Sequence, residues 1–213
     1  MLTMPKPRRL LVDLQSTPFY HCISRCVRRA YLCGDDPLTG MNFDHRKQWL
    51  IDRMKTLARI FAIDICSYST MSNHFHLVLR IDADRGRRLS DEQVVERYGG
   101  VFPKAVKKLK KVSESERHRL ISLWRERLWD LSWYMRCLNE AIARQANRED
   151  GCSGRFWEGR FRSQALLDEG ALLTCMSYVD LNPIRAGIAD SLEASEFTSI
   201  LSLIHISEPT RPY

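Results

Sequence analysis

The stretch HFHLVLRI, residues 74–81, alternates two kinds of side chain along its length. In a β-strand, successive side chains point to opposite faces of the sheet. One face then carries Phe75 and the aliphatic residues that follow it at every second position, and this face must be the core side. His74 and His76 lie side by side on the opposite face, with Cβ atoms roughly 6–7 Å apart from the strand rise. Two imidazoles at this spacing can bind one divalent metal ion, although solvent-facing or hydrogen-bonded histidines give the same pattern.

Outward from this strand, hydrophobic periodicity predicts three further strands and two helices. The strands are expected at residues 17–27, 63–70 and 155–166. One helix follows a single apolar stripe within residues 42–61. The other begins after Asp168, a residue suited to an N-cap, and ends or kinks near Asn182 because Pro183 follows. The order strand, helix, strand, strand, insertion, strand, helix is typical of an α+β sandwich.

The charge of the chain is concentrated in one segment. The 213 residues carry a net charge of +7, and residues 85–148 hold sixteen Lys and Arg against eight Asp and Glu. A basic segment beside a nearly neutral remainder favours a polyanionic partner, nucleic acid before membrane. Because no strand pattern occurs there, we expect a basic helical insertion at about residues 89–150. A solvated helical face is the alternative interpretation.

The seven cysteines and the hydropathy exclude several classes of protein. Their number is odd and no CxxC pair occurs, which argues against a disulfide framework and a zinc ribbon. The sequence contains no secretory signal and no apolar run of bilayer-spanning length. We therefore expect a cytoplasmic protein that does not enter a membrane.

The two ends of the chain are expected to lie outside the folded unit. Residues 1–16 are rich in Pro and basic residues and predict a flexible arm, so a single domain is expected over residues 17–200. Residues 201–213 (LSLIHISEPTRPY) do not continue the preceding pattern and resemble the translation of a sequencing adapter. We treat this segment as a non-native tail and take no functional residue from it.

Other candidate functional residues lie near the C-terminal helix. Tyr178 and Asn182 are four residues apart and share one helix face, although a tyrosine at the edge of a buried face usually packs there and Asn before Pro usually stops a helix. Arg160 and Arg162 lie on a basic face of the predicted last strand that could follow a phosphate backbone. Arg185 could also contact phosphate or simply complement the helix dipole.

Three segments together resemble a known family. The strings are YHCISRCVRRAYLCG, MSNHFHLVLR and GRFWEGRFRSQALLDEGALLTCMSYVDLNPIRAG. They resemble the single-tyrosine HUH transposases, named for a His-hydrophobic-His motif, and within them the REP-associated tyrosine transposases. The resemblance covers about residues 19–85 and 155–194. HUH alone is a loose motif, whereas HUH followed about a hundred residues later by Tyr-x-x-x-Asn-Pro is specific.

The resemblance implies a role for each matching residue. His74 and His76 match the metal-binding pair, Tyr178 matches the nucleophile, and Asn182 matches a position that can supply a third metal ligand. The implied cofactor is Mg²⁺ or Mn²⁺, although this ligand set suits Zn²⁺ more obviously. The implied fold is a ferredoxin-like sandwich, an antiparallel sheet with helices on one face. The implied reaction nicks and rejoins single-stranded or hairpin DNA through a 5′-phosphotyrosine.

Several alternatives stay open at this point. Conjugative relaxases place their tyrosine before the histidines, and rolling-circle initiators lack the Asn-Pro-x-Arg-Ala-Gly signature, so both are disfavoured. A non-catalytic protein that binds repeat hairpins has the same residues available, as does a metal-dependent nuclease that uses water while Tyr178 only packs. Family members act as monomers or as dimers, so the resemblance leaves a homodimer open.

Overall fold

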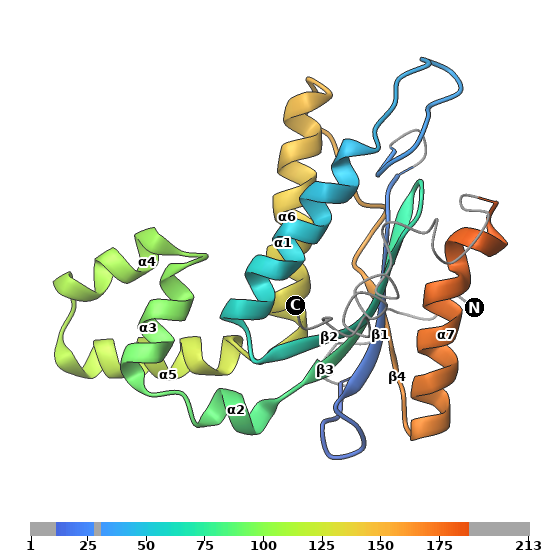
Figure 1. Ribbon diagram of the computed structural model, residues 1–213. Coiled ribbons are helices and arrows are strands. Elements are labelled where there is room, and N and C mark those ends of the chain that lie inside the picture. The colour runs from blue at the N-terminus through green and yellow to red at the C-terminus, as the bar shows by residue number, and fades with distance from the viewer. Residues whose placement is uncertain (1–11, 28–30, 188–213) are drawn as a thin grey trace, which may run out of the picture.

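The computed structural model describes residues 12–27 and 31–187 of the chain, and four strands within them form one antiparallel sheet (Figure 1). The sheet order is β2-β3-β1-β4. The strands are β1 Phe19–Arg25, β2 Ile63–Thr70, β3 His74–Ile81 and β4 Arg162–Ala165. β1 is central and pairs with both β3 and β4. The predicted α+β class and antiparallel sheet are confirmed.

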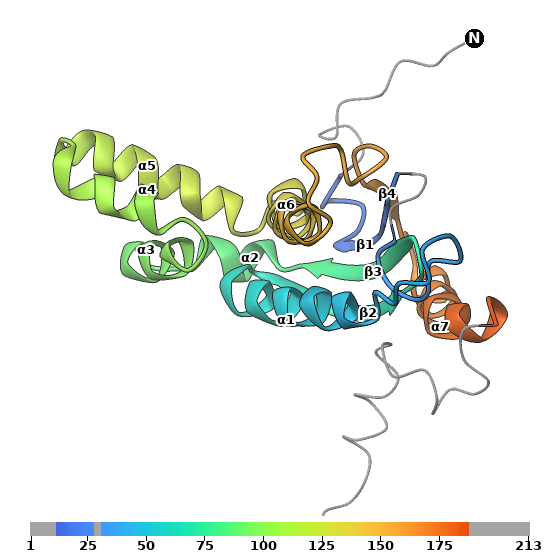
Figure 2. The same cartoon turned by 90° about the horizontal axis from the view of Figure 1, so that it is seen from above.

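Helices cover both faces of this sheet (Figures 1 and 2). α1 (His45–Ile60) and α6 (Leu131–Glu149) lie on the face to which β3 contributes Phe75 and its alternate neighbours. α7 (Glu169–Arg185) lies on the opposite face, where Val78 packs against Val179. The expectation of helices on one face is therefore corrected. The histidine face of β3 also presents an apolar Val78, and α7 removes that side chain from water.

The helix α6 belongs to the sandwich itself. Tyr134, Leu138 and Ile142 on α6 are all buried in the main core. The elements β1, α1, β2, β3, α6 and β4 then follow the β-α-β-β-α-β order of a ferredoxin-like fold. The helical insertion expected at residues 89–150 is consequently shorter than predicted, because its last helix completes the core.

The remaining short helices form a lobe that extends away from the sheet (Figures 1 and 2). They are α2 Ala83–Arg87, α3 Asp91–Gly99, α4 Pro103–Lys108, the 3₁₀ helix η2 Leu109–Lys111, and α5 Glu114–Arg127. Tyr98 on α3 stacks on Trp124 of α5 with ring centroids 4.5 Å apart. We call residues 83–127 the helical lobe.

Two predicted boundaries differ in the structure. The last strand was expected over residues 155–166, but β4 begins only at Arg162. Before it, the chain follows the end of β1 irregularly: Val27 donates its backbone N–H to Phe156, and Glu158 donates to Arg25. The sequence predicted that α7 ends or kinks near Asn182, and the helix does not end there but continues through Pro183 to Arg185. Pro183 cannot donate a backbone hydrogen bond, but the turn that follows it is closed by the bond from Ala186 N–H to the carbonyl of Asn182. Gly187, at φ +67°, follows the end of α7, where a left-handed glycine commonly closes a helix.

The ends of the chain and the cysteines complete the description. Residues 12–16 are attached to the sheet, since the Tyr20 hydroxyl donates to the backbone carbonyl of Asp13 over 2.9 Å. The rest of the predicted arm and the predicted tail lie outside the described residues. All seven cysteines are free thiols, as the absence of a disulfide pattern predicted. Within residues 12–27 and 31–187, no helix is long and apolar enough to cross a membrane.

Candidate active site

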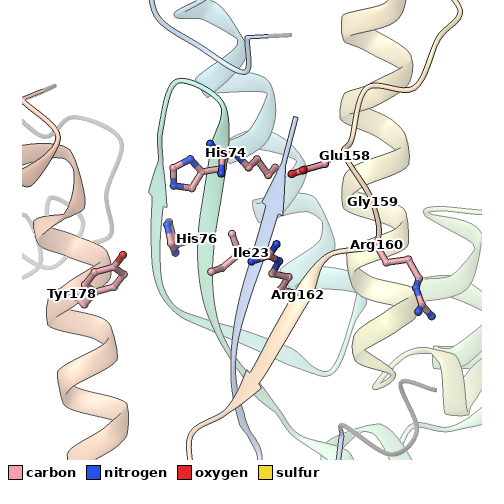
Figure 3. A pocket seen from close by; sticks show the side chains of 9 residues that line it. Ile23, His74, His76, Glu158, Gly159, Arg160, Arg162 and Tyr178 are labelled. Atoms are coloured by element: carbon pink, nitrogen blue, oxygen red, sulfur yellow. The ribbon is translucent and has the colours of Figure 1, made fainter. Parts of the chain in front are cut away.

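A pocket of about 410 Å³ lies between the histidine face of the sheet and α7. Figure 3 shows His74 and His76 on β3 facing Tyr178 on α7. The lining residues come from β1, β3, β4, α7 and the segment before β4. They are Ile23, Arg25, His74, His76, Glu158, Gly159, Arg160, Arg162 and Tyr178. The structure thus brings five of the seven residues singled out from the sequence into one cavity.

Each of the two histidines is held by a hydrogen bond at Nδ1. His74 Nδ1 lies 2.8 Å from Oδ1 of Asn73, and His76 Nδ1 lies 2.9 Å from Nε2 of His21. The Nε2 atom of His76 is buried and has no partner within the described part of the chain. An unpartnered polar atom in a buried position is uncommon and points to a missing ligand or water.

Burial keeps these imidazoles neutral. The pKa of His76 is lowered to about 3, first by burial and then by the neighbouring rings of His21 and His74. Burial also lowers the pKa of His21, and burial together with the charge of Arg25 lowers that of His74. Only a neutral imidazole offers a lone pair to a metal ion. The two histidines are therefore in the protonation state that metal binding requires at neutral pH.

The position of Tyr178 follows from the burial of the next residue on α7, Val179. The helix begins after Asp168, whose side chain accepts from the backbone N–H of Ala171 over 2.7 Å. Eleven residues after this N-cap, Val179 is fully buried against Val78 and Leu166. Tyr178 precedes it and so lies at the edge of the buried face, 42% exposed, as the helical pattern predicted. Its ring is edge-on to that of His76, with centroids 5.8 Å apart.

Asn182, one turn beyond Tyr178, does not line the pocket. Its side chain is buried, and its Nδ2 atom has no partner among the described residues. Asp180 is buried on the same helix and accepts a hydrogen bond from the Ser67 hydroxyl over 3.1 Å. The predicted role of Asn182 as a third metal ligand therefore remains a prediction.

The mouth of the pocket is rich in arginine. Arg160 and Arg162 are exposed and line it, although the side chain of Arg160 is directed away from the histidines (Figure 3). Arg185 lies outside the lining, with its Cζ atom 5.9 Å from the centre of the Tyr178 ring. Such a position is within the range of a cation–π contact. These cations give the pocket mouth a charge suited to a phosphate group.

Four lining residues were not selected from the sequence, namely Ile23, Arg25, Glu158 and Gly159. Arg25 lies opposite His74 in the β1–β3 register, and Glu158 is held beside it by the backbone bond described above. Strand alternation does place His21, Ile23 and Arg25 on one face of β1. The sequence does not reveal that β1 is the neighbour of β3, so this signal could not be used.

The histidine pair is not part of a larger cluster of conventional metal ligands. Among the described residues, no group of three or more His, Cys, Asp or Glu side chains is arranged to hold a metal ion. A metal ion at this position would be bound by the two imidazoles and completed by amide, water or phosphate oxygens.

The fold was compared with solved structures. A REP-associated tyrosine transposase bound to a REP hairpin matches with a TM-score of 0.55 and 14% sequence identity, over 98% of this chain and 89% of that one. This chain has the fold of that transposase. The resemblance inferred from the sequence motifs is thus confirmed at the level of the fold. No protein-family model and no curated protein matches the sequence.

Proposed function

We propose that this chain is a metal-dependent DNA transposase that cuts and rejoins one DNA strand with Tyr178 as nucleophile. The observation that carries the proposal is the meeting of His74, His76 and Tyr178 in one pocket, from two elements about a hundred residues apart in sequence. Tyr178 is 42% exposed and its ring centroid lies 5.8 Å from that of His76, so its side chain is accessible from the pocket. The fold of a REP-associated tyrosine transposase supports the same function.

The residues present fit a divalent metal ion. The buried Nε2 atom of His76 has no partner in the described structure, and the imidazoles are neutral at neutral pH. His74 and His76 would hold Mg²⁺ or Mn²⁺, with Asn182 as a candidate third ligand. When bound, such an ion neutralises charge on the phosphoryl oxygens and orients the phosphate.

The proposed chemical step is an in-line displacement at phosphorus. The Tyr178 oxygen forms a bond to the phosphorus, the phenol loses its proton, and the bond to the 3′-oxygen of the preceding nucleotide breaks. That oxygen takes up a proton and leaves as a 3′-hydroxyl, while the phosphate stays on Tyr178 as a 5′-phosphotyrosine. Arg162 and Arg185 are suited to hold the phosphates that flank the scissile bond. Because the number of phosphoester bonds is conserved, a second 3′-hydroxyl can reverse the step and join new ends.

The proposed substrate is single-stranded or hairpin DNA. Its phosphates would contact Arg160 and Arg162 at the pocket and a second basic surface on the helical lobe. Among described residues of the lobe, Arg87, Arg119 and Arg125 form ion pairs with acidic side chains. No ion pair is recorded there for the exposed lysines of α4 and η2, which are Lys104, Lys107, Lys108, Lys110 and Lys111. Arg88 and Arg117 are likewise exposed without an ion pair among the described residues, so these five lysines are the larger part of the unpaired positive charge on the lobe.

A cleavage assay tests the function. Labelled hairpin DNA is incubated with Mn²⁺ and the full chain, and the products are separated on a denaturing gel. We expect a protein–DNA band that requires metal and is absent from Tyr178→Phe and His76→Ala. Cleavage that persists in Tyr178→Phe would indicate a hydrolytic nuclease. Salt-sensitive binding without cleavage would indicate a hairpin-binding protein.

A further inference from the structure

His21 contacts His76 from the neighbouring strand. In the antiparallel register, Ile23 lies opposite His76 and Val78 lies opposite His21, so the two histidines are diagonal neighbours on one face. Their rings are stacked, with centroids 5.1 Å apart and an angle of 15° between planes. Both side chains are buried, and His21 Nε2 lies 2.9 Å from His76 Nδ1.

This hydrogen bond admits two proton arrangements, and they have different consequences. One nitrogen must carry the proton and the other must offer a lone pair. If His21 donates, the proton of neutral His76 lies on Nε2, which becomes a buried donor without an acceptor in the described structure. If His76 donates, its Nε2 atom offers a lone pair. A buried donor or acceptor without a partner costs free energy in either arrangement, and only the second arrangement lets a metal ion at Nε2 remove that cost.

The other histidine of the pair is held in the same way. Asn73 Oδ1 can only accept, so the bond of 2.8 Å to His74 Nδ1 places the proton of His74 on Nδ1. His74 therefore also has its lone pair on Nε2. Metal-binding histidines generally donate their other ring N–H to a neighbouring acceptor, which fixes the tautomer and the ring orientation. In this site Asn73 occupies one acceptor position, and His21 lies where the second acceptor would be.

We propose that His21 is a positioning residue that accepts the Nδ1–H of His76 and keeps the Nε2 lone pair of His76 available in the pocket beside Tyr178. The relevance of His21 to catalysis rests on the proposed function, whereas the tautomer of His76 is independent of it. Removing the acceptor should release the proton of His76 to either nitrogen and weaken metal binding about 10- to 100-fold.

The first test is the tautomer of His76, measured by ¹H–¹⁵N NMR of the imidazoles in the full chain without metal or DNA. We expect the Nδ1–H form in the native protein and in His21→Gln, whose side-chain oxygen can accept. In His21→Phe we expect the Nε2–H form or a mixture. An Nε2–H form in the native protein would overturn the proposal, as would an unchanged tautomer in His21→Phe.

The second test is Mn²⁺ affinity by calorimetry. We expect weaker binding in His21→Phe, recovery in His21→Gln, and no change in His118→Phe, a variant of an exposed histidine on α5. Equal affinity in the native protein and His21→Phe would overturn the proposal. If the native protein bound no Mn²⁺ while His76 kept the expected tautomer, the proposed function would fail and the role of His21 in fixing the ring would stand.

Discussion

The rings of Tyr178 and His76 meet edge-on across the pocket, with centroids 5.8 Å apart and planes at 80°. Tyr178 lies on α7 and His76 lies on β3, so their proximity depends on how α7 packs against the sheet. The apolar contact between α7 and the sheet is small. Its buried cluster consists of Val78, Leu166 and Val179 with a few partly buried neighbours.

The packing of α7 on the sheet should be sensitive to the shortening of one buried side chain. Val179→Ala removes two methyl groups from a fully buried position and should lower the free energy of unfolding by about 2 kcal/mol. Leu173→Ala, on the exposed side of the same helix, should change it by less than about 0.5 kcal/mol. Urea denaturation followed by circular dichroism measures both. Equal effects would show that α7 does not pack as described.

Substitutions of His76 and of Tyr178 should have different effects on the affinity for metal. His76→Ala removes a ligand and should abolish measurable Mn²⁺ binding in calorimetry. Tyr178→Phe keeps both imidazoles and should bind Mn²⁺ with nearly native affinity, although it forms no adduct. Loss of metal binding in Tyr178→Phe would contradict the assignment of separate roles to the two residues.

The lysines of the helical lobe should contribute to the decrease in DNA affinity with increasing salt concentration. Each lysine that contacts a phosphate contributes about 0.7 to 0.9 to the slope of log affinity against log salt concentration. Replacing Lys107, Lys108 and Lys111 with Gln should therefore reduce the slope by about 2. Lys55→Gln, an exposed lysine on α1, serves as the control. An unchanged slope in the triple variant would exclude the lobe from the DNA interface.

The cysteines should differ in reactivity according to burial. Burial raises the pKa of Cys26 and of Cys33 to about 12, so both remain protonated thiols at pH 8. The thiolate is the reactive form. Maleimide labelling of the native protein should therefore modify the exposed Cys152 first, and unfolding should expose all seven thiols. Mass spectrometry of the labelled peptides checks the order, and early labelling of Cys26 would contradict the described core.

Hydrophobic periodicity was sufficient to predict the strand and the helix that carry the histidine pair and Tyr178. Alternation along residues 74–81 placed the histidines opposite the core face, and the helical pattern placed Tyr178 at the edge of the face that Val179 anchors. Both positions depend only on the geometry of one strand or one helix.

What sequence reasoning missed depends on which elements are neighbours. The apolar residues of α6, including Tyr134 and Leu138, follow helical spacing. They lie within a segment rich in charge, for which the sequence predicted a basic helical insertion. The contacts of His21 and Arg25 with the histidine pair follow from the pairing of β1 with β3. No periodicity within a single element determines that pairing.

The most direct test of the central claim is to locate the covalent bond to DNA. The full chain would be incubated with hairpin DNA and Mn²⁺, digested with nuclease and trypsin, and examined by tandem mass spectrometry. Tyr178 is the only tyrosine in the tryptic peptide 163–185. The account predicts a nucleotide attached to Tyr178 through its 5′-phosphate. Cleaved DNA with this peptide unmodified, or an adduct on another residue, would contradict it.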